Sequence, residues 1–394
     1  MKKDVCLLII AMSLINAQIY NTFNYGGENR GYYLYLPDSL GNDAPLIMGF
    51  HGYSGSAESF INYTEIMDVA DQFGFAVCSP QGTLDDWNNS FWNVGYSFHA
   101  NETVDDVGFV SSLAEYLQNE YSLSEENTFC TGMSNGGDLS FLLACEASEI
   151  FAAVAPVAGT MMLDFYNECN PEYPIPIFEI HGTNDDITYW DGDINDEDGW
   201  GPYLDIPTII EFWIQENNCT EYSMDTLPDI YPNDGSYVIS HQYSGGINDN
   251  QVWFYEVVNG GHDWPGIWGN MDIHSTEEIW NFFELTFLNT SVTSVKNYDD
   301  KFTSFSLEQN YPNPFNPTTT IEFSIKNSSN VLFEIFDLNG RLVITLLNKK
   351  LYAGKHQIVW AGNDELGEII SSGIYFYKIS INKEQKIKSM VYIK

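Results

Sequence analysis

The sequence predicts two domains: an α/β domain built on a mostly parallel sheet with helices on both faces, and a small all-β sandwich after it. Three observations support this prediction. The chain has 394 residues, more than one ordinary domain holds. Strand-like and helix-like segments alternate up to about residue 287, and only short strand-like segments follow residue 308. The balance of charge changes between the same two regions.

Charge divides the chain near residue 295. Residues 18–295 contain one basic residue, Arg30, and 44 acidic ones, whereas residues 296–394 contain 12 basic and 10 acidic residues. A surface as acidic as that of the first region repels nucleic acid and anionic membranes, so we expect neither as a partner. Solubility is the simplest explanation of this surface. The step in charge indicates two modules with different roles.

The first 17 residues have the pattern of a secretory signal peptide. Lys2 and Lys3 precede an apolar run over 5–15 that is too short to span a bilayer, and Ala17 precedes the expected cleavage site. No other segment reaches ~20 apolar residues. We therefore expect a secreted, extracellular or cell-surface protein without stable membrane insertion.

Export permits disulfide bonds, and five cysteines follow the expected cleavage site. We expect Cys169 and Cys219 to pair, because both lie in polar loop sequence. The other three lie in apolar runs and are expected to be small core residues: Cys78, Cys130 and Cys145.

The α/β domain is predicted over residues 18–288. Its expected strands cover 32–36, 45–50, 75–79, 128–131, 152–157, 175–180 and 252–258. Helical patterns cover 56–73, 104–121, 135–147, 207–217 and 275–287, and the last begins with a capping-box sequence. This alternation predicts a parallel sheet, whose ligands bind beyond the carboxyl ends of its strands.

The first motif at such an end is Thr131-Gly132-Met133-Ser134-Asn135-Gly136-Gly137, between a predicted strand and a predicted helix. A G-x-S-x-G sequence in this position is typical of a nucleophile elbow, a turn so sharp that only glycine fits beside the serine. The helix N-terminus would face the oxygen that becomes negative. We therefore expect Ser134 to be a nucleophile; the alternative is a plain glycine-rich turn.

A second glycine-flanked turn, His51-Gly52-Tyr53-Ser54-Gly55, follows the predicted strand 45–50. Such a turn lets backbone N–H groups point into a site. We expect the N–H groups of Tyr53 and Asn135 to form an oxyanion hole. The alternative is an ordinary turn, and His51 itself is expected to be structural rather than a base.

The third motif, Ile180-His181-Gly182-Thr183-Asn184-Asp185-Asp186, ends the predicted strand 175–180. An acid on this loop can orient an imidazole and stabilise its cationic form. The residues alone leave Asp185 and Asp186 open as that acid.

The fourth motif, Asn259–Gly266, follows the predicted strand 252–258 and contains His262. Four histidines follow Ser134 in this domain, and only His262 lies on a glycine-rich loop at a strand end. We expect it to act as the general base. The order serine, acid, histidine is that of the α/β-hydrolases, so the sequence predicts this fold and a serine hydrolase.

Five sequence motifs of this domain, HGYSGSAESF, SPQG with a following WN, GMSNGG, HGTNDD and NGGHDWPG, resemble those of the secreted feruloyl esterase and polyhydroxybutyrate depolymerase-like α/β-hydrolases. The resemblance covers about residues 29–287. It implies hydrolysis of carboxylic esters through an acyl-enzyme, without a cofactor. It also implies Ser134 as nucleophile, Asp185 rather than Asp186 as acid, and His262 as base.

An acidic insert, Asp191–Asp198, departs from the pattern of that family. Its oxygen ligands suit calcium, but an EF-hand would need a glycine at the sixth position and a glutamate at the twelfth, and both are missing. We therefore expect a solvated acidic loop and no metal site. Among the tryptophans near the expected site, Trp264 is expected to line the pocket. One or two of the others could stack on a phenolic or sugar group, and most are expected to be packing residues: Trp87, Trp92, Trp190 and Trp200.

A polar linker is predicted over 289–307. After the sequence YPNPFNP, strand-like segments predict an Ig-like β-sandwich over 308–394, at 318–325, 331–337, 341–347, 356–361, 374–381 and 387–393. YPNPFNP, the strand GIYFYKI and the lysine-dotted end resemble the C-terminal sorting domain of the type IX secretion system. The resemblance implies export by that machinery. The alternative is a carbohydrate- or protein-binding module.

Three functions are compatible with these patterns. The favoured one is a secreted serine esterase acting on feruloyl- or acetyl-type esters of plant polysaccharide. The second is a polyhydroxybutyrate depolymerase with the same mechanism. The third is a surface binding protein on a hydrolase scaffold that has no turnover. The fold and the three catalytic groups specify a mechanism and leave the ester open.

Overall fold

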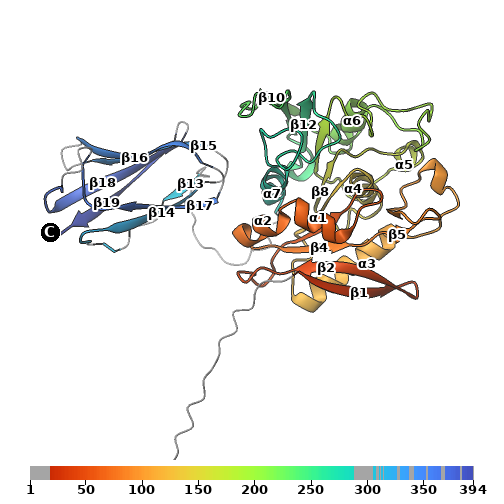
Figure 1. The fold of residues 1–394 in the computed structure, drawn as a ribbon, viewed down its shortest axis with the longest axis horizontal. Coiled ribbons are helices and arrows are strands. Elements are labelled where there is room, and N and C mark those ends of the chain that lie inside the picture. The colour runs from red at the N-terminus through yellow and green to blue at the C-terminus, as the bar shows by residue number, and fades with distance from the viewer. Residues whose placement is uncertain are drawn as a thin grey trace, which may run out of the picture. The chain divides into compact units, whose positions relative to one another are not determined.

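The computed structural model divides into two units, Met1–Asn289 and Thr290–Lys394 (Figure 1). The structure describes residues 18–287 without a gap. In the second unit it describes residues 305–307, 310, 312–313, 315–325, 329–336, 341–351, 354–364, 369–381 and 384–393. The predicted signal peptide, residue 288 of the predicted α/β domain and residues 289–304 of the predicted linker lie outside these ranges. Each unit is described by itself.

The first unit is built on a ten-stranded sheet with the order β1-β2-β4-β3-β7-β8-β9-β12-β11-β10. The six central strands, β4 to β12 in this order, are parallel, and the two outer strands at each edge run antiparallel to their neighbours. The strands are β1 (Ile19–Tyr25), β2 (Glu28–Tyr35), β3 (Leu46–Phe50), β4 (Ala76–Pro80), β7 (Thr128–Met133), β8 (Ala153–Val157), β9 (Ile177–Gly182), β10 (Glu221–Thr226), β11 (Tyr237–Ser244) and β12 (Val252–Val258). A separate small hairpin consists of β5 (Thr83–Leu84) and β6 (Ser90–Phe91).

Helices cover both faces of this sheet, as the alternation predicts. Packing on one face is made by α1 (Ala57–Tyr63), α2 (Ile66–Phe73) and α7 (Ser275–Leu285), and on the other by α3 (Asp106–Tyr121), α4 (Asn135–Glu146) and α6 (Ile206–Glu216). The remaining helical segments are α5 (Leu163–Glu168) and the 3₁₀ turns η1 (Ser97–His99) and η2 (Ile247–Asp249). The central strands are buried on both faces, which explains their nearly continuous apolar sequence.

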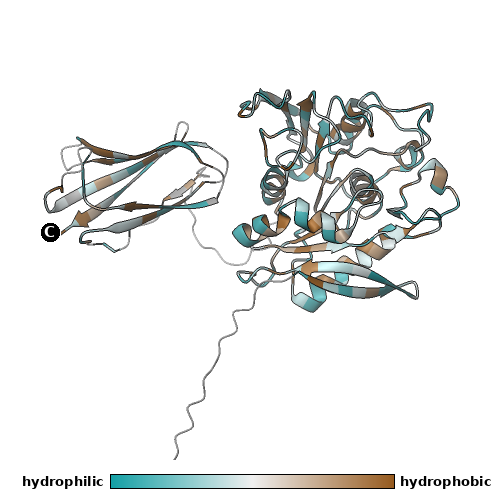
Figure 2. Ribbon diagram, in the orientation of Figure 1, coloured by the Kyte–Doolittle hydropathy of each residue, from teal (hydrophilic) through white to brown (hydrophobic). Residues whose placement is uncertain are grey.

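The single helix predicted over 56–73 is wrong, because the chain forms two helices there. Glu65 adopts a left-handed conformation, with φ 54°, and starts α2 in a new direction. Both helices carry hydrophilic and hydrophobic residues (Figure 2), and each buries only its apolar side, with Phe60 and Ile61 from α1 and Ile66 and Val69 from α2. Apolar spacing continued through the break, so the pattern alone could not locate it.

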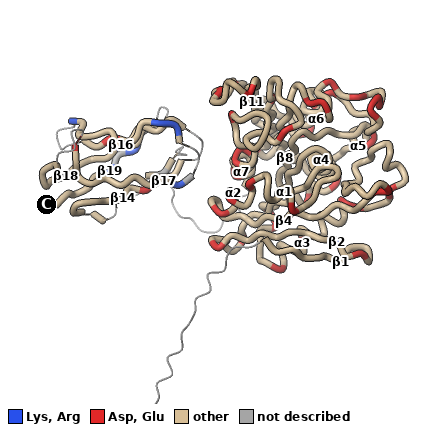
Figure 3. The backbone as a smooth tube through the Cα atoms, in the orientation of Figure 1, with Lys and Arg blue, Asp and Glu red and all other residues tan. Residues whose placement is uncertain are grey.

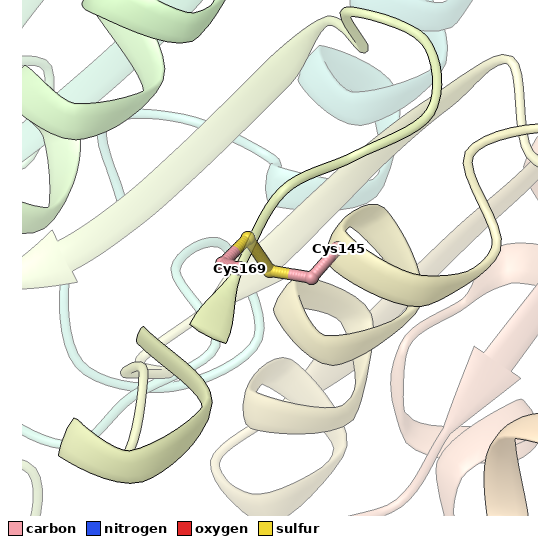
Figure 4. The surroundings of a disulfide bond; sticks show 2 residues. All are labelled: Cys145 and Cys169. Atoms are coloured by element: carbon pink, nitrogen blue, oxygen red, sulfur yellow. A yellow bond between two sulfur atoms is a disulfide. The ribbon is translucent and has the colours of Figure 1, made fainter. Parts of the chain in front are cut away.

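The disulfide bond also differs from the prediction. Cys169, which we expected to pair with Cys219, is bonded to Cys145 at the end of α4 (Figure 4). Their Cα atoms are 5.0 Å apart, within the range of ordinary disulfides. Cys219 is a half-buried free thiol. Cys145 is buried in the core, as expected, but it lies on the last turn of α4, where α5 ends beside it and brings Cys169 within bonding distance.

Removal of this bond is expected to lower the free energy of unfolding by about 3 kcal/mol, because the bond closes a short loop in the unfolded chain. The double variant C145S/C169S, compared with the wild type in urea unfolding, tests this. C219S is the control and should change the free energy by less than about 0.5 kcal/mol. A larger loss in C219S than in the double variant would contradict the assigned pairing.

Acidic residues are spread over the first unit, whereas lysine and arginine gather on the second (Figure 3). Arg30 is 7% exposed; its guanidinium contacts Asp106 at 2.6 Å and lies over the Phe109 ring, 3.8 Å from the centroid. Arg30, the one basic residue of residues 18–295, is therefore buried beside an acid and offers no positive surface to an anionic ligand.

The second unit is a small sandwich, as predicted. One sheet has the order β13-β14-β17 and the other β16-β15-β18-β19. The strands are β13 (Phe305–Leu307), β14 (Thr319–Ile325), β15 (Ser329–Phe336), β16 (Leu342–Leu351), β17 (Gly354–Trp360), β18 (Gly373–Ile381) and β19 (Glu384–Tyr392). The last residues of the predicted linker form β13, which pairs with β14. Among the described residues of the whole chain, no helix has the length and apolar character needed to cross a membrane.

Candidate active site

Ser134 lies at the tight turn between β7 and α4, where the sequence predicts a nucleophile elbow. Its backbone has φ 57° and ψ −124°, a conformation that is unfavourable for a residue with a side chain by about 1–3 kcal/mol. Strain of this kind persists only where the surrounding structure enforces it. The turn leaves the serine partly exposed, at the carboxyl end of a central parallel strand.

Glycines on both sides of Ser134 make this turn possible. A Cβ on Gly132 would collide with the backbone of Gly136, and one on Gly136 would collide with the carbonyl oxygen of Phe50. The side-chain amide of Asn135 fixes the turn from another direction, since it accepts from the N–H of Trp92 at 2.7 Å and donates to its carbonyl oxygen at 3.0 Å. The elbow is thus fastened to β3 and to the segment that follows β6.

Asp185 and His262 come together across the loops that follow β9 and β12. His262 Nδ1 donates to Asp185 Oδ2 at 2.8 Å. The other carboxylate oxygen of Asp185 accepts from the N–H groups of Ile187 and Thr188 at 2.9 and 2.8 Å, so the buried charge is fully hydrogen-bonded. With Nδ1 as the donor, Nε2 of His262 is the nitrogen available as a base. Asp186 is exposed and makes no such contact.

A second buried acid and imidazole lie behind Asp185, which sequence reasoning missed. His181 Nε2 donates to the carbonyl oxygen of Thr188 at 2.9 Å and lies 3.6 Å from Asp185 Oδ2, and its Nδ1 lies 2.9 Å from Glu179 Oε1. Burial raises the pKa of Glu179 and lowers the pKa of His181. Both shifts favour the neutral forms, and the geometry agrees with them, because His181 Nε2 donates to Thr188 and leaves Nδ1 as an acceptor facing the Glu179 carboxyl.

Two backbone N–H groups beside Ser134 have no acceptor within the described part of the chain: those of Tyr53 and Asn135. Asn135 is the first residue of α4, whose opening N–H groups have no partner inside the helix. A Cβ on Gly52 would lie 3.3 Å from Ser134 Cβ, so the turn that carries Tyr53 passes directly over the serine. Both groups therefore remain free to donate to a ligand beside Ser134.

His51 holds that turn and is not placed as a base. Its Nε2 accepts from the N–H of Gly82 at 3.0 Å, and its Nδ1 donates to the carbonyl oxygen of Gly52 at 2.8 Å. Burial lowers the pKa of His51 to about 4, so the ring is neutral at pH 7. The neutral ring orients the peptide between Gly52 and Tyr53.

The hydroxyl of Ser134 and the imidazole of His262 are not hydrogen-bonded to each other among the described contacts of residues 18–287. Catalytic contacts of this type are often loose before the substrate binds. His262 follows Gly260 and Gly261, and its side chain is 16% exposed, on the same edge of the sheet as Ser134. The structure thus joins the acid to the imidazole and leaves the contact between imidazole and serine open.

A small pocket lies beside Ser134. It holds about 280 Å³ of empty space, part of it open to solvent. Its lining residues follow the carboxyl ends of the parallel strands: Tyr96, Ser134, Asp138, Thr160, Met162, Ile187, Thr188, Trp200 and Tyr203. Within the described residues, the buried hydroxyl of Thr160 has no hydrogen-bond partner. A volume below that of a drug-sized ligand site suits a small acyl group.

Trp264 does not line this pocket, contrary to the prediction from its neighbour His262. Its side chain is fully buried and packs edge-on against Phe60 and Tyr63, with centroids 5.6 and 6.1 Å away. Its indole N–H donates to Thr276 Oγ1 at 3.2 Å. Successive residues of the loop point in different directions, so adjacency to the histidine did not place the ring. Trp200, one of the four tryptophans of which most were expected to be packing residues, lines the pocket instead.

Asp138 is a pocket residue that no motif marked. It is 2% exposed, and it accepts hydrogen bonds from the Tyr96 hydroxyl and the Thr160 N–H, both at 2.7 Å. Burial raises the pKa of Asp138 to about 7, although both hydrogen bonds lower it. The carboxyl is therefore partly protonated near neutral pH, and it can both accept from and donate to a ligand.

This raised pKa predicts a pH-dependent contribution to stability. Between its unfolded value near 3.8 and about 7, the folded protein keeps a proton on Asp138 that the unfolded chain releases, so stability falls as the pH rises through this window. The stability of the wild type relative to D138N should therefore be greatest near pH 4 and decline towards pH 7. Melting temperatures of both proteins across this range check it, and a constant difference would contradict it.

The acidic insert uses its carboxylates to hold its own loop. Asp193 accepts from the N–H groups of Glu197 and Asp198, and Asp196 accepts from the N–H of Gly201 and the hydroxyl of Ser97. Among the residues that the structure describes, no group of three or more histidines, cysteines or acids is arranged to hold a metal ion.

Comparison with known families agrees with this architecture. Residues 30–168 match the family model described as Esterase PHB depolymerase, and residues 309–394 match the one described as Secretion system C-terminal sorting domain. The sheet that contains the first match has an antiparallel second strand, and its third and fourth strands exchange places in the strand order. The first unit has the α/β-hydrolase fold, and about half of it matches an esterase family model. Both resemblances seen in the sequence are thereby confirmed.

Curated relatives of the α/β-hydrolase unit include proteins named as acetylxylan esterases and feruloyl esterases. A bifunctional acetylxylan esterase/xylanase of Neocallimastix patriciarum is 27% identical over 41% of this chain and 22% of its own length. Feruloyl esterase B of Piromyces equi is 24% identical, over 47% and 34%. Acetylxylan esterase A of Emericella nidulans is 25% identical, over 38% and 49%. The chain thus spans less than half of the length of each relative.

A solved structure, an acetyl xylan esterase from Aspergillus awamori, is similar to 68% of this chain and 99% of its own, with 16% identity and a TM-score of 0.47. The sorting-domain match of the second unit indicates secretion.

Proposed function

We propose that this protein is a secreted carboxylic-ester hydrolase that works through an acyl-enzyme. Ser134 is the nucleophile, His262 the general base and Asp185 the acid that orients His262. The observation that carries the proposal is the strained serine turn, which shares one edge of the sheet with a hydrogen-bonded aspartate and histidine. A binding protein without turnover would have no need to maintain this strain.

The reaction runs in two halves. Ser134 Oγ attacks the ester carbonyl while its proton moves to His262 Nε2, and the N–H groups of Tyr53 and Asn135 stabilise the negative oxygen. The imidazolium then gives this proton to the departing alcohol oxygen, and the acyl group stays on Ser134. Water repeats the sequence on the acyl-enzyme, with His262 again taking and returning the proton. Asp185 stabilises the imidazolium in both halves.

For the substrate, we propose feruloyl- or acetyl-type esters of plant polysaccharide. The curated relatives carry the names of acetylxylan and feruloyl esterases. The small pocket and the polar groups of Asp138 and Thr160 within it favour a short acyl group such as acetyl. The family model is also named for polyhydroxybutyrate depolymerase, which makes a polyester the second candidate.

Three substrates separate these candidates: acetylated xylan, methyl ferulate and solid polyhydroxybutyrate. We expect acid release from acetylated xylan to be fastest, measured by titration at constant pH. Release from the polyester alone would support the depolymerase. An intact protein that hydrolyses none of the three, and that is not labelled at Ser134 by a serine-reactive phosphonate, would refute an esterase altogether.

For the second unit, we propose engagement of the type IX secretion machinery, supported by the sorting-domain match over 309–394. Deletion of this segment should leave the esterase unit inside a host that carries the machinery. Unchanged export of the truncated protein would show that the segment has another role.

A further inference from the structure

Aromatic rings continue from the pocket beside Ser134 out to the surface. Phe98 packs against Tyr96 and Trp200, both in the pocket lining, with centroid distances of 5.5 and 5.4 Å. On its other side it packs against Trp87 at 5.9 Å. Trp87 is 62% exposed, although it is one of the largest apolar side chains. We call these four residues the aromatic strip; the strip leads from the buried Tyr96 to the exposed Trp87.

Trp87 is held in place although its ring is exposed. It lies in the turn between β5 and β6, where Asp85 Oδ1 accepts from the N–H groups of Trp87 and Asn89 at 2.9 and 2.8 Å. Asp85 is buried, and hydrogen bonds from Tyr53 and its neighbours hold its pKa at about 2 despite burial, so it stays charged. An exposed indole on a fixed turn is ready for a ligand, because little ordering remains to be lost on binding.

The acidic insert takes no part in the proposed catalytic steps, but it holds the backbone at Trp200 in place. Its carbonyl oxygen accepts from the Ser97 N–H at 3.0 Å. Asp196 accepts from the next residue, Gly201, and from the Ser97 hydroxyl, at 2.8 and 2.7 Å. Asp196 of the insert therefore fixes the backbone at Trp200 against the segment that carries Phe98.

We propose that the aromatic strip is a binding subsite for a pyranose ring of the neutral polysaccharide that carries the ester. This rests on the proposed esterase function and adds a second contact outside the acyl pocket. The flat faces of Trp87 and Trp200 offer apolar surface to the C–H face of a sugar. Exposed carboxylates beside the strip, Asp86 and Glu197, can accept hydrogen bonds from sugar hydroxyls.

The acidic residues around the strip favour a neutral polysaccharide over an anionic one. The surroundings of the strip carry acids, and the one arginine of residues 18–295 is buried against Asp106, so a polymer of uronic acids would be repelled. A neutral sugar chain meets no such barrier. The volume of the pocket fits a short acyl group, which leaves the strip to the alcohol side of the ester.

The test compares two esters that differ in having a sugar ring: an acetylated xylo-oligosaccharide and methyl acetate. For W87A we expect KM for the oligosaccharide to rise about tenfold, the loss of one stacking contact of ~1.4 kcal/mol. The rise in KM for methyl acetate should be clearly smaller. Tyr222→Ala, at a 54% exposed aromatic on the far edge strand β10, is the matched control and should change neither KM.

Equal changes on both esters, or no change on the oligosaccharide, would overturn the subsite. A larger effect on methyl ferulate than on the oligosaccharide would assign the strip to an aryl group instead. The inactive variant S134A allows binding to be measured without hydrolysis. It should bind unacetylated xylo-oligosaccharide in calorimetry, and S134A/W87A should bind it about tenfold more weakly. If S134A still hydrolysed methyl acetate, the esterase proposal itself would fail, and this result is distinct from a failure of the subsite.

Discussion

Replacing Ser134 with alanine is expected to lower kcat for ester hydrolysis on the order of 10⁶-fold, because no other group can form the acyl-enzyme. The measurement is acid release from acetylated xylan by S134A and by the wild type. Ser111→Ala is the control, since this buried hydroxyl on α3 has no hydrogen-bond partner among the described residues and lies outside the site. Its rate should equal that of the wild type.

Ser134→Gly sharpens the same experiment. Glycine tolerates the positive φ of the elbow, so S134G should be as inactive as S134A and more stable by about 1 kcal/mol. Equal melting temperatures for the two variants would mean that the turn is not strained. Retained activity in either would remove Ser134 from the mechanism.

Replacing Asp185 with asparagine is expected to lower kcat by about 10⁴-fold with a smaller effect on KM. Asparagine can present its NH₂ group to His262 Nδ1, which favours the tautomer that carries its proton on Nε2, and it supplies no charge to the imidazolium. Kinetics on the acetylated substrate at pH 7 measure both parameters.

The neighbouring acid provides a control of the same charge and size. Asp186→Asn should keep nearly the full rate, because this exposed carboxyl does not contact His262. The reverse result, with D186N impaired and D185N active, would require the loop to rearrange on substrate binding and would reject the assignment of Asp185.

Sequence reasoning located the turns that carry chemistry because their glycines follow from local geometry. The elbow at Ser134 and the turn at Gly52 need residues without a side chain, whatever the rest of the fold does. The pairing of Asp185 with His262 then follows from the strand order, since β9 and β12 are parallel neighbours whose carboxyl ends meet. The turns depend on local backbone geometry and the pairing on strand order, and both can be predicted from a sequence.

The errors concern contacts between side chains from separate segments. The partner of Cys169 depends on how α5 returns to the end of α4, and the exposure of Trp264 depends on what packs over it. Asp138 gave no signal at all, because an aspartate in an apolar helix pattern does not reveal that it faces a pocket. Such contacts are set by the packed fold rather than by spacing along the chain.

The bridge between Cys145 and Cys169 joins neighbours along the chain, 24 residues apart, and β8 is the strand between them. Oxidation can therefore proceed as soon as this stretch has crossed into an oxidising compartment, before β9 and β12 have been delivered. The disulfide bond at the end of α4, the helix that follows Ser134, can then form before the loops that carry Asp185 and His262 have crossed.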